Sequence, residues 1–296
     1  MKLPESVMGV GRGAGRGQVR ILFLGDLFGE PGRRAVIESL PQLRAEYAPD
    51  LVIANGENTA SGLGITPRIF RTLCEAGIDV VTLGNHALHR REIAETLRAT
   101  CDETSDAATP ARLIRPANLP DGAPGRGWTT VLTRPPHDGV MPVRVAVYNL
   151  QGRVFMNPLD SPFTASDRMI AETPDDIVVR FVDFHAEATS EKLLMGRYLD
   201  GRVSAVIGTH THVQTADETI LPGGTAFLCD AGMCGAVESV IGSRPEPVFE
   251  SLRTGMPVRM EVADGPCMIC GCMVDIDTRT GRAAAIRRVQ LVAEAK

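Results

Sequence analysis

The chain lacks the features that would place it in a membrane or an oxidising compartment. No segment of its 296 residues approaches 18 consecutive apolar residues, and its start has no apolar stretch of the signal-peptide kind. Its seven cysteines are an odd number without disulfide-framework spacing. These absences argue against a transmembrane helix and predict a cytoplasmic protein with free thiols.

The chain also has no excess of basic residues. Its 31 Lys and Arg are outnumbered by 36 Asp and Glu, which gives a formal net charge of -5. General nucleic-acid binding usually needs a basic balance, so the charge argues against it. It does not argue against a phosphate substrate, because bound metal ions can supply the local positive charge.

Three cysteines lie close together in Cys267-Met-Ile-Cys270-Gly-Cys272. A C-x-x-C pattern can bind metal or undergo redox chemistry, but no second cysteine pair stands at zinc spacing. The surrounding residues form an apolar, strand-like run. Because free cysteine behaves as a small hydrophobic residue, we favour an ordinary buried strand.

The first 18 residues differ from the rest of the chain, since residues 8–17 consist largely of Gly and Arg. Such a segment buries little apolar surface, so residues 1–18 are predicted to be a disordered extension. A Gly/Arg tail can also touch RNA, and this alternative stays open. From residue 19 to 296 no change in composition marks a linker, and 44% apolar content suffices for a sizeable core, so we expect one domain.

Five short apolar runs each end in a polar cluster. They are residues 20–26, ending in Asp26; 51–58, ending in Glu57 and Asn58; 80–86, ending in Asn85 and His86; 177–185, ending in His185; and 206–213, containing His210 and His212. Runs of Val, Ile, Leu and Phe are typical of strands buried on both faces. Open α/β sheets bind ligands outside the carboxyl ends of their strands, so the clusters predict one shared site.

Each of these residues also has an ordinary structural explanation. Asp26 or Glu57 could cap a helix, Asn58 and Asn85 could shape turns, and His185 could be a hydrogen-bonded core histidine. Such coincidences at the ends of five strands are much rarer than one common site, which we therefore favour.

His210 and His212 are the strongest indication of metal binding. Residues two apart on a strand share a face, and imidazole is a frequent ligand of zinc, iron, manganese and nickel. Together with the carboxylates, amides and third histidine they make six or seven N/O donors without a thiolate, more than one tetrahedral zinc uses. Two metal ions fit better, as in phosphatases and nucleases.

Helix signals occupy the segments between the runs. Thr66-Pro67 and Gly77 predict the start and end of one helix, and residues 190–198 predict another. Pro31 opens a segment that Pro41 should end or kink. Alternating strands and helices imply parallel strands. Residues 257–262, 268–276 and 284–292 instead predict an antiparallel meander.

The polar clusters, in order, resemble the signature of the calcineurin-like metallophosphoesterases: Gly25-Asp26, Gly56-Glu57-Asn58, Gly84-Asn85-His86, His185 and Gly208-Thr-His-Thr-His212. Longer segments resemble the bacterial YmdB-type phosphodiesterases: residues 56–60, 115–118, 149–152, 183–192 and 208–217. The resemblance runs from about Val19 to the C-terminus. It implies an α/β fold whose core is a two-sheet β-sandwich flanked by helices, in four layers α/β/β/α, with the C-terminal meander matching the second sheet.

The resemblance also implies roles for the site residues. One metal ion would be bound by Asp26, Asn58 and His212, the other by Asn85, His185 and His210, with Glu57 bridging the two and His86 acting as general acid. A metal-bridging hydroxide would attack phosphorus, and His86 would protonate the leaving oxygen. The implied substrates are phosphodiesters, most of all 2′,3′-cyclic nucleotides.

Two positions depart from the wider family. Phe28 stands where the usual Asp-x-His motif has its histidine, so Asn58 is expected to replace that ligand, which favours iron or manganese over zinc. Ala87-Leu88-His89 replaces a segment that usually reads Thr-Trp-Asp. His89 could alter substrate contacts, although a solvated residue in the first turn of a helix is the simpler interpretation.

Two other functions stay open from the sequence. A metal-dependent amidohydrolase also uses a His-x-His strand, but normally as its first barrel strand, whereas here the pair comes on a late strand and Asp26 is on the first. A regulator could keep the fold and metal ions with little turnover. A homo-oligomer is also left open.

Weaker signals surround the main motifs. Gly62-Leu-Gly64 could bring backbone amides to a phosphate or form a plain turn. Arg115, Asn118 and Arg153 could contact substrate or only shape loops.

Overall fold

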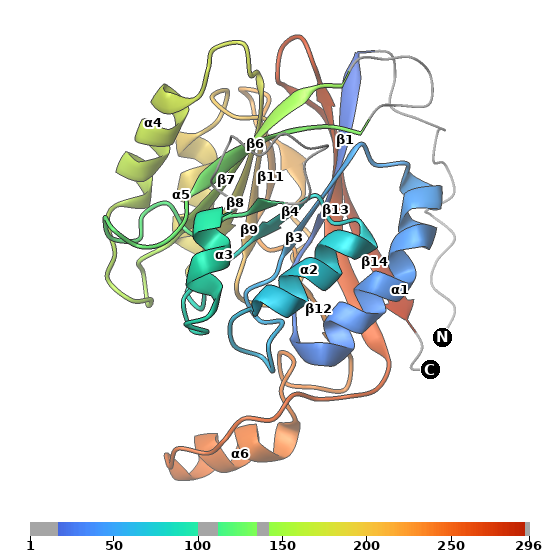
Figure 1. Ribbon diagram of the computed structural model, residues 1–296, viewed down its shortest axis with the longest axis vertical. Coiled ribbons are helices and arrows are strands. Elements are labelled where there is room, and N and C mark those ends of the chain that lie inside the picture. Colours follow the sequence, from blue (N-terminus) through green and yellow to red (C-terminus); the bar gives the residue numbers. More distant parts are fainter. Residues whose placement is uncertain (1–16, 100–111, 135–141, 294–296) are drawn as a thin grey trace.

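The computed structural model describes residues 17–99, 112–134 and 142–293, and two β-sheets form the centre of this part of the chain (Figure 1). The first sheet has the order β2-β12-β13-β1-β3-β4-β5, with β14 paired to β13. Its strands are β1 (Gln18–Leu24), β2 (Asp26–Leu27), β3 (Leu51–Asn55), β4 (Val80–Thr82), β5 (Arg112–Leu113), β12 (Met233–Ala236), β13 (Cys267–Asp277) and β14 (Ala283–Ala293). β1, β3, β4 and β5 run parallel, as predicted.

The second sheet has the order β10-β11-β9-β8-β7-β6. Its strands are β6 (Trp128–Leu132), β7 (Arg144–Gln151), β8 (Val179–His185), β9 (Ala205–Thr209), β10 (Thr219–Ile220) and β11 (Ala226–Leu228). β7, β8, β9 and β11 are parallel, and the outer strands β6 and β10 are antiparallel to their neighbours. The predicted strands with polar ends are thus divided between two sheets.

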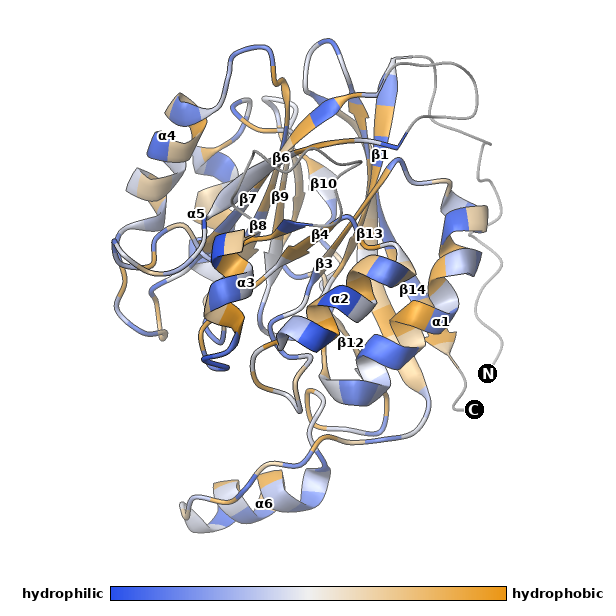
Figure 2. Cartoon of the chain, in the orientation of Figure 1, coloured by the Kyte–Doolittle hydropathy of each residue, from blue (hydrophilic) through white to orange (hydrophobic). Residues whose placement is uncertain are grey.

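Helices cover the outer face of each sheet. They are α1 (Gly29–Tyr47), α2 (Pro67–Ala76), α3 (Ile93–Ala99), α4 (Pro162–Glu172) and α5 (Thr189–Tyr198), whereas α6 (Pro245–Thr254) projects away from both sheets and has no buried residue (Figure 1). Three apolar clusters define the layers. One joins α1, α2 and α3 to the first sheet, the second lies between the sheets, and the third joins α4 and α5 to the second sheet. Apolar residues accordingly line the strands in Figure 2. The four-layer α/β/β/α arrangement is confirmed.

The C-terminal strands lie in a different sheet from the one expected. β13 pairs with β1 in the first sheet, and the second sheet is built from residues 128–228. Residues 257–262 form no strand apart from an isolated bridge at Val262. β13 is buried along most of its length and contributes to the core between the sheets through Cys272, Val274 and Ile276. Because β13 is buried on both faces, it fits the interior of the first sheet better than a place in the second sheet.

Most of the sequence signals for helix ends agree with the helix ends in the structure. Thr66 caps α2 by accepting a hydrogen bond from the Ile69 amide at 3.2 Å, and Gly77 ends it in the left-handed conformation. Of the two effects expected at Pro41, an end of the helix is wrong, because α1 continues to Tyr47. Apolar residues on both sides of the proline, Val36, Leu40 and Leu43, are buried in the first core, and their burial favours a continuous helix.

Three further predictions concern the cysteines, the N-terminal extension and the absence of a transmembrane helix. Cys267, Cys270 and Cys272 are free and buried in β13, as expected for an ordinary strand. Residues 1–16 of the predicted disordered extension lie outside the described residues, and β1 begins at Gln18, within its predicted end. Among the described residues, no helix has both the length and the apolar character needed to cross a membrane.

Candidate metal centre

The structure brings all seven predicted metal ligands together where the carboxyl ends of the two sheets meet. Asp26, Glu57, Asn58 and Asn85 follow β1, β3 and β4, whereas His185 ends β8 and His210 and His212 follow β9. Gly84 makes the approach possible, because a Cβ there would lie 2.4 Å from a Glu57 carboxylate oxygen and 2.3 Å from the His185 ring. The prediction of one shared site is thus supported by the geometry.

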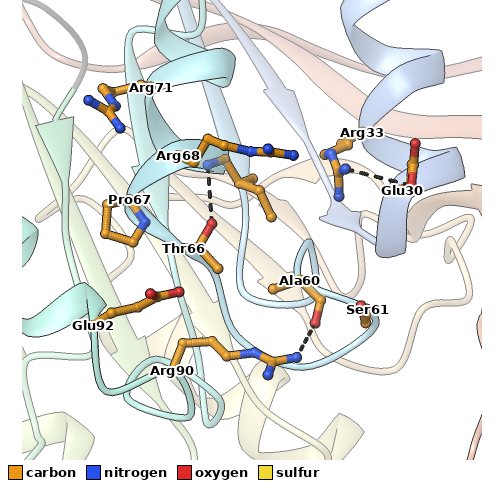
Figure 3. Close-up of a pocket in the computed structure, with 11 residues that line it drawn as sticks. Glu30, Arg33, Ala60, Ser61, Thr66, Pro67, Arg68, Arg71, Arg90 and Glu92 are labelled. Carbon is orange, nitrogen blue, oxygen red and sulfur yellow. Dashed lines mark hydrogen bonds and ion pairs between the residues drawn. The ribbon is translucent and has the colours of Figure 1, made fainter.

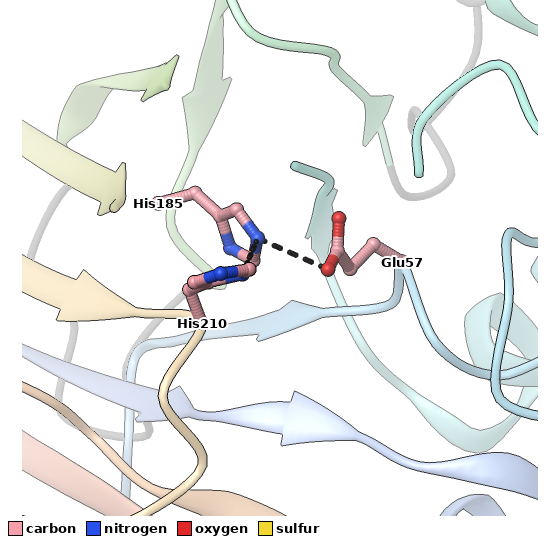
Figure 4. A group of neighbouring side chains, drawn as sticks. All are labelled: Glu57, His185 and His210. Carbon is pink, nitrogen blue, oxygen red and sulfur yellow. Dashed lines mark hydrogen bonds and ion pairs between the residues drawn. The ribbon is translucent and has the colours of Figure 1, made fainter. Parts of the chain in front are cut away.

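His185 lies at the centre of the cluster (Figure 4). Its Nε2 is 3.0 Å from Glu57 Oε1, 2.9 Å from Asn85 Oδ1 and 3.0 Å from His210 Nδ1. Ligands bound about 2.0–2.2 Å from one ion lie about 3 Å from one another. The three contacts of His185 Nε2 therefore have the spacing of neighbouring donors around one metal ion.

The hydrogen bonds of His185 leave Nε2 as the atom available for a metal. Thr209 Oγ1 donates to Asp183 Oδ1 at 2.7 Å and has no second proton to give. The 2.9 Å contact between His185 Nδ1 and Thr209 Oγ1 is therefore donated by Nδ1. A neutral His185 then has its lone pair on Nε2, directed at the other donors.

The other two histidines are held in the same way. His212 Nδ1 donates to the carbonyl of Ile241 at 2.9 Å, which leaves the lone pair on Nε2, where it accepts from Asn58 Nδ2 at 3.2 Å and lies 3.7 Å from Asp26 Oδ1. His210 Nε2 is 3.1 Å from Glu187 Oε2, which leaves Nδ1 facing His185. The two histidines thus face different groups of donors.

The expectation that His210 and His212 share one strand face is wrong. β9 ends at Thr209, and the two histidines have φ values of 101° and 67° in the following loop. A positive φ is uncommon for residues other than glycine and is held by its surroundings at functional sites. Here the His210 amide donates to Asp26 Oδ2 at 3.1 Å, and Asp230 accepts from the Thr211 amide between the histidines at 3.0 Å.

Asp26 supplies the clearest sign that a cation belongs here. Its Oδ1 is buried and has no hydrogen-bond partner among the described residues, while 3.7 and 3.9 Å separate it from nitrogens of His212 and His185. Burial raises the pKa of Asp26 above its usual range. A buried carboxylate oxygen without a donor is costly, and a metal ion would remove that cost. The all-N/O donor set therefore fits metal ions.

The charges around Glu57 and His185 follow from their contact. Burial by itself would raise the pKa of Glu57, but the adjacent His185 lowers it below its usual range. Burial likewise opposes the charged form of His185, yet Glu57 raises its pKa. Burial lowers the pKa of His210 to about 3, with His185 adding to the effect, so its ring is neutral. Without a metal ion, the protonated ring of His185 is the positively charged member of this group.

Glu57 lies between the two groups of donors, as a bridging ligand should. Its Oε1 is 3.0 Å from His185 Nε2 and 3.2 Å from Asn58 Nδ2, and its Oε2 accepts from the His86 amide at 3.0 Å. Asn58 presents Nδ2 rather than Oδ1 to His212. Its amide would have to turn over to bind a metal ion through oxygen.

His86 lies beside the donors. Asn85 Nδ2 is 3.2 Å from His86 Nε2, and because the amide nitrogen can only donate, the neutral ring carries its proton on Nδ1. Burial lowers the pKa of His86 below its usual value. A groove of about 1070 Å³ is lined by His86, Glu57, Asn58, His210 and His212 together with residues 258–262. His86 therefore lines the cavity in which a substrate would bind.

The two departures from the family pattern have simple outcomes. Phe28 lines the groove with its ring 5.5 Å from the His212 ring, edge to face, and so packs against a candidate ligand. His89 is exposed, but in a turn before α3 rather than in its first turn, with its ring 5.9 Å from that of His86.

Several supporting residues were missed by the sequence reasoning. Asp183 is buried, accepts from Asn55 Nδ2 and Thr209 Oγ1, and has its pKa raised to about 7 by burial. It lies two residues before His185 on β8, and residues two apart on a strand share a face. This spacing was the sequence signal that could have identified Asp183. Asp230 and Glu187 hold the histidine loop, but nothing in their sequence surroundings indicates it.

Three of the weaker sequence signals, Asn118, Arg115 and Arg153, make hydrogen bonds within the protein. Asn118 Nδ2 donates to the carbonyls of Gln151 and Asp160, and Arg115 donates to the carbonyl of Pro116. The Arg153 guanidinium donates to the carbonyl of Leu159. All three side chains shape loops.

Comparison with known proteins agrees with this fold. A calcineurin-like phosphoesterase of Bacillus subtilis, YfkN, aligns over 92% of this chain and 90% of its own with a TM-score of 0.53 at 12% identity, which shows the shared fold. A structure described as a novel phosphatase from Mycoplasma pneumoniae is 31% identical, covers 94% of each chain and has a TM-score of 0.82.

The chain has the calcineurin-like phosphoesterase fold. The sequence model of the YmdB-like protein family matches residues 22–289, and the chain belongs to that family. A 2′,3′-cyclic-nucleotide 2′-phosphodiesterase of Bacillus subtilis strain 168 is 45% identical over 271 residues, 92% of this chain and 96% of that protein.

Proposed function

We propose that the protein is a dinuclear metal-dependent phosphodiesterase that hydrolyses cyclic nucleotides, with 2′,3′-cyclic nucleotides as preferred substrates. Membership in the family makes the chain a phosphoric diester hydrolase. The observation that carries the metal-dependent mechanism is the convergence of lone-pair atoms on His185 Nε2, next to the unpartnered Asp26 Oδ1.

In the proposed site, Asp26, Asn58 and His212 hold one ion and Asn85, His185 and His210 the other, with Glu57 between them. This division follows the contacts, since His212 faces Asn58 and His210 faces His185. Bound ions supply Lewis-acid activation of the phosphate and of the attacking water. Amide, carboxylate and imidazole donors without thiolate favour manganese or iron.

The protein's own groups would orient the substrate and move the proton. His86 lines the groove, so its doubly protonated ring would be the candidate acid for the leaving ribose oxygen. Its lowered pKa makes it a readier proton donor once charged. The 2′,3′-cyclic preference is taken from the 45% identical relative.

The alternatives differ in their support. The first strand lies in an open sheet rather than a barrel, which removes the basis for an amidohydrolase. A regulator with little turnover would need the same ligands and stays the second candidate. RNA contact by the N-terminal segment and a homo-oligomer stay predictions of the sequence.

Metal analysis combined with kinetics tests the proposal. Wild type, His86→Ala and the exposed control His89→Ala would be assayed with bis(p-nitrophenyl) phosphate and with 2′,3′-cyclic nucleotides. We expect about two metal ions per chain in all three proteins. Turnover should fall about 10²–10⁴-fold in His86→Ala and stay near wild type in His89→Ala.

The outcomes separate the candidates. Fewer than one metal ion per chain, or unchanged turnover without His86, would refute the mechanism. Two metal ions with no hydrolysis by the wild type would favour the regulator.

A further inference from the structure

A second hollow, beside the catalytic groove, is lined by four arginines. It has a volume of about 610 Å³ and receives Arg33 from α1, Arg68 and Arg71 from α2, and Arg90 from the segment before α3 (Figure 3). The acidic residues on its wall are Glu30 and Glu92. In a chain with a net charge of -5, such a concentration of arginine needs an explanation.

Two of the arginines are fixed by the chain that separates the hollow from the groove. Arg33 Nη1 donates to the carbonyl of Thr59 at 2.9 Å. Arg90 donates to the carbonyls of Ala60 and Leu63 at 2.8 and 3.1 Å. These bonds use only part of each guanidinium and hold the rest in place, so binding a ligand would cost little side-chain entropy.

Arg33 and Arg68 repel one another. Figure 3 shows their guanidinium groups pointing toward each other across the hollow. Burial lowers the pKa of Arg33, Glu30 opposes this, and Arg68 adds to it. Glu30 is 3.9 Å from Arg33, and 71% of its side chain is exposed, so it compensates weakly. An anion between the two arginines would relieve the repulsion.

The hollow and the groove adjoin. Ser61 and Arg90 line both of them, so a ligand in the groove lies next to the hollow. The hollow is also far larger than a single small anion needs and falls within the size range of sites for drug-sized ligands. Planar guanidinium groups suit phosphate, which they bind through paired hydrogen bonds.

We propose that this arginine hollow is a subsite for a second phosphate group of the substrate. The favoured substrates are then 5′-phosphorylated cyclic nucleotides or short RNA chains ending in a 2′,3′-cyclic phosphate, rather than the unphosphorylated cyclic mononucleotide. The inference rests on the proposed function, since the scissile cyclic phosphate occupies the groove.

The test compares the variant Arg68→Gln/Arg71→Gln with the control Arg91→Gln/Arg98→Gln. Arg68 and Arg71 are exposed wall residues outside the proposed catalytic machinery, and the control pair is exposed and lines neither cavity. The substrates are adenosine 2′,3′-cyclic monophosphate, its 5′-phosphorylated form, and a diribonucleotide with a 2′,3′-cyclic end.

We expect the wild type to have about tenfold higher kcat/KM for at least one substrate with a second phosphate, and this preference to weaken with salt. The arginine variant should lose the preference but keep its activity on the plain cyclic nucleotide, and the control should keep both. Whichever substrate gains identifies the source of the second phosphate. Equal kcat/KM values for all three substrates in the wild type would overturn the inference, as would a preference that the arginine variant retains.

A binding experiment separates failure of the subsite from failure of the proposed function. Adenosine 3′-monophosphate and adenosine 3′,5′-bisphosphate contain no phosphodiester, so calorimetry with them does not depend on turnover. Tighter binding of the bisphosphate by wild type alone supports the subsite even if no phosphodiester is hydrolysed. Equal binding of the two by an active wild type overturns the subsite and leaves the proposed function standing.

Discussion

Each histidine of the candidate metal centre has one ring nitrogen tied to the protein and the other turned toward the site. His185 is held by Thr209, His212 by the Ile241 carbonyl and His210 by Glu187. Such partners fix the tautomer and orient the ring before a metal ion binds. At the scale of the residue, metal affinity should therefore depend on groups that touch no metal ion.

Replacing Thr209 by Val tests this dependence. The variant keeps the volume of the side chain but removes the acceptor of the His185 Nδ1 proton. Metal affinity should fall about 10–100-fold, measured by competition with chelators of graded strength. The exposed Thr219→Val on β10 is the matched control and should bind metal like the wild type. Equal affinities in the two variants would show that the Thr209 contact does not orient His185.

A second prediction concerns the ion pair under the histidine loop. Lys192 Nζ is 2.6 Å from Asp230 Oδ2, and both side chains are almost fully buried. Asp230→Ala leaves the lysine charge buried alone, so we expect a loss of about 3–5 kcal/mol in unfolding free energy by urea denaturation.

The control for Asp230 is an ion pair of the same length on the surface. Asp167 and Arg202 are also 2.6 Å apart but are 48% and 36% exposed. Asp167→Ala should cost at most about 1 kcal/mol. Similar losses in the two variants would contradict the assigned role of burial.

The sequence could name the ligands of the site but not their supports. Histidine, carboxylate and amide at strand ends carry a recognisable chemical pattern. Asp230 reaches Lys192 across 38 residues, and Glu187 belongs to no strand end. Such contacts depend on how distant segments pack, and only the structure reveals them.

At the scale of the element, close packing of α1 against β12 gives a third prediction. Alanine is ordinarily favoured over glycine within a helix by about 1 kcal/mol. A Cβ on Gly32 would, however, lie 2.0 Å from the carbonyl oxygen of Cys234 in β12. We expect Gly32→Ala to destabilise the protein by about 1–3 kcal/mol in urea denaturation, because neither backbone can yield easily.

Gln42→Ala, at an exposed position of the same helix, controls for helix propensity. Its unfolding free energy should stay within about 0.5 kcal/mol of the wild type. Stabilisation by Gly32→Ala would mean that α1 can move away from β12.

Elements were predictable where their signals are local. Thr66 and Gly77 mark the ends of α2 because capping involves residues only a few positions apart. The expected helix end at Pro41 and the sheet chosen for the C-terminal strands failed, because tertiary packing decided both. The prediction that the histidine pair lies on a strand was wrong, because His210 and His212 have positive φ values. Contacts with Asp26 and Asp230 set these values.

At the scale of the whole molecule, the candidate metal centre joins the two sheets. Asp26, Glu57, Asn58 and Asn85 come from the first sheet, and three histidines from the second. Removing the ions would leave a buried carboxylate oxygen without a partner at the junction, Asp26 Oδ1. Metal binding should therefore stabilise the native state as a whole as well as the site.

This coupling predicts that chelation lowers the melting temperature. A ligand present at 100 times its Kd stabilises the native state by about 2.7 kcal/mol. In a chain of this size each kcal/mol shifts Tm by about 2 °C, so we expect a fall of about 5 °C or more in calorimetry after chelation, reversed by adding manganese. Glu57→Ala, which lacks the proposed bridge, should show a much smaller difference between its metal-loaded and chelated forms. Because each protein is compared with itself, this difference is separate from any destabilisation by the substitution. If the wild type loses its ions and its activity with no change in Tm, the two sheets hold this junction together without metal.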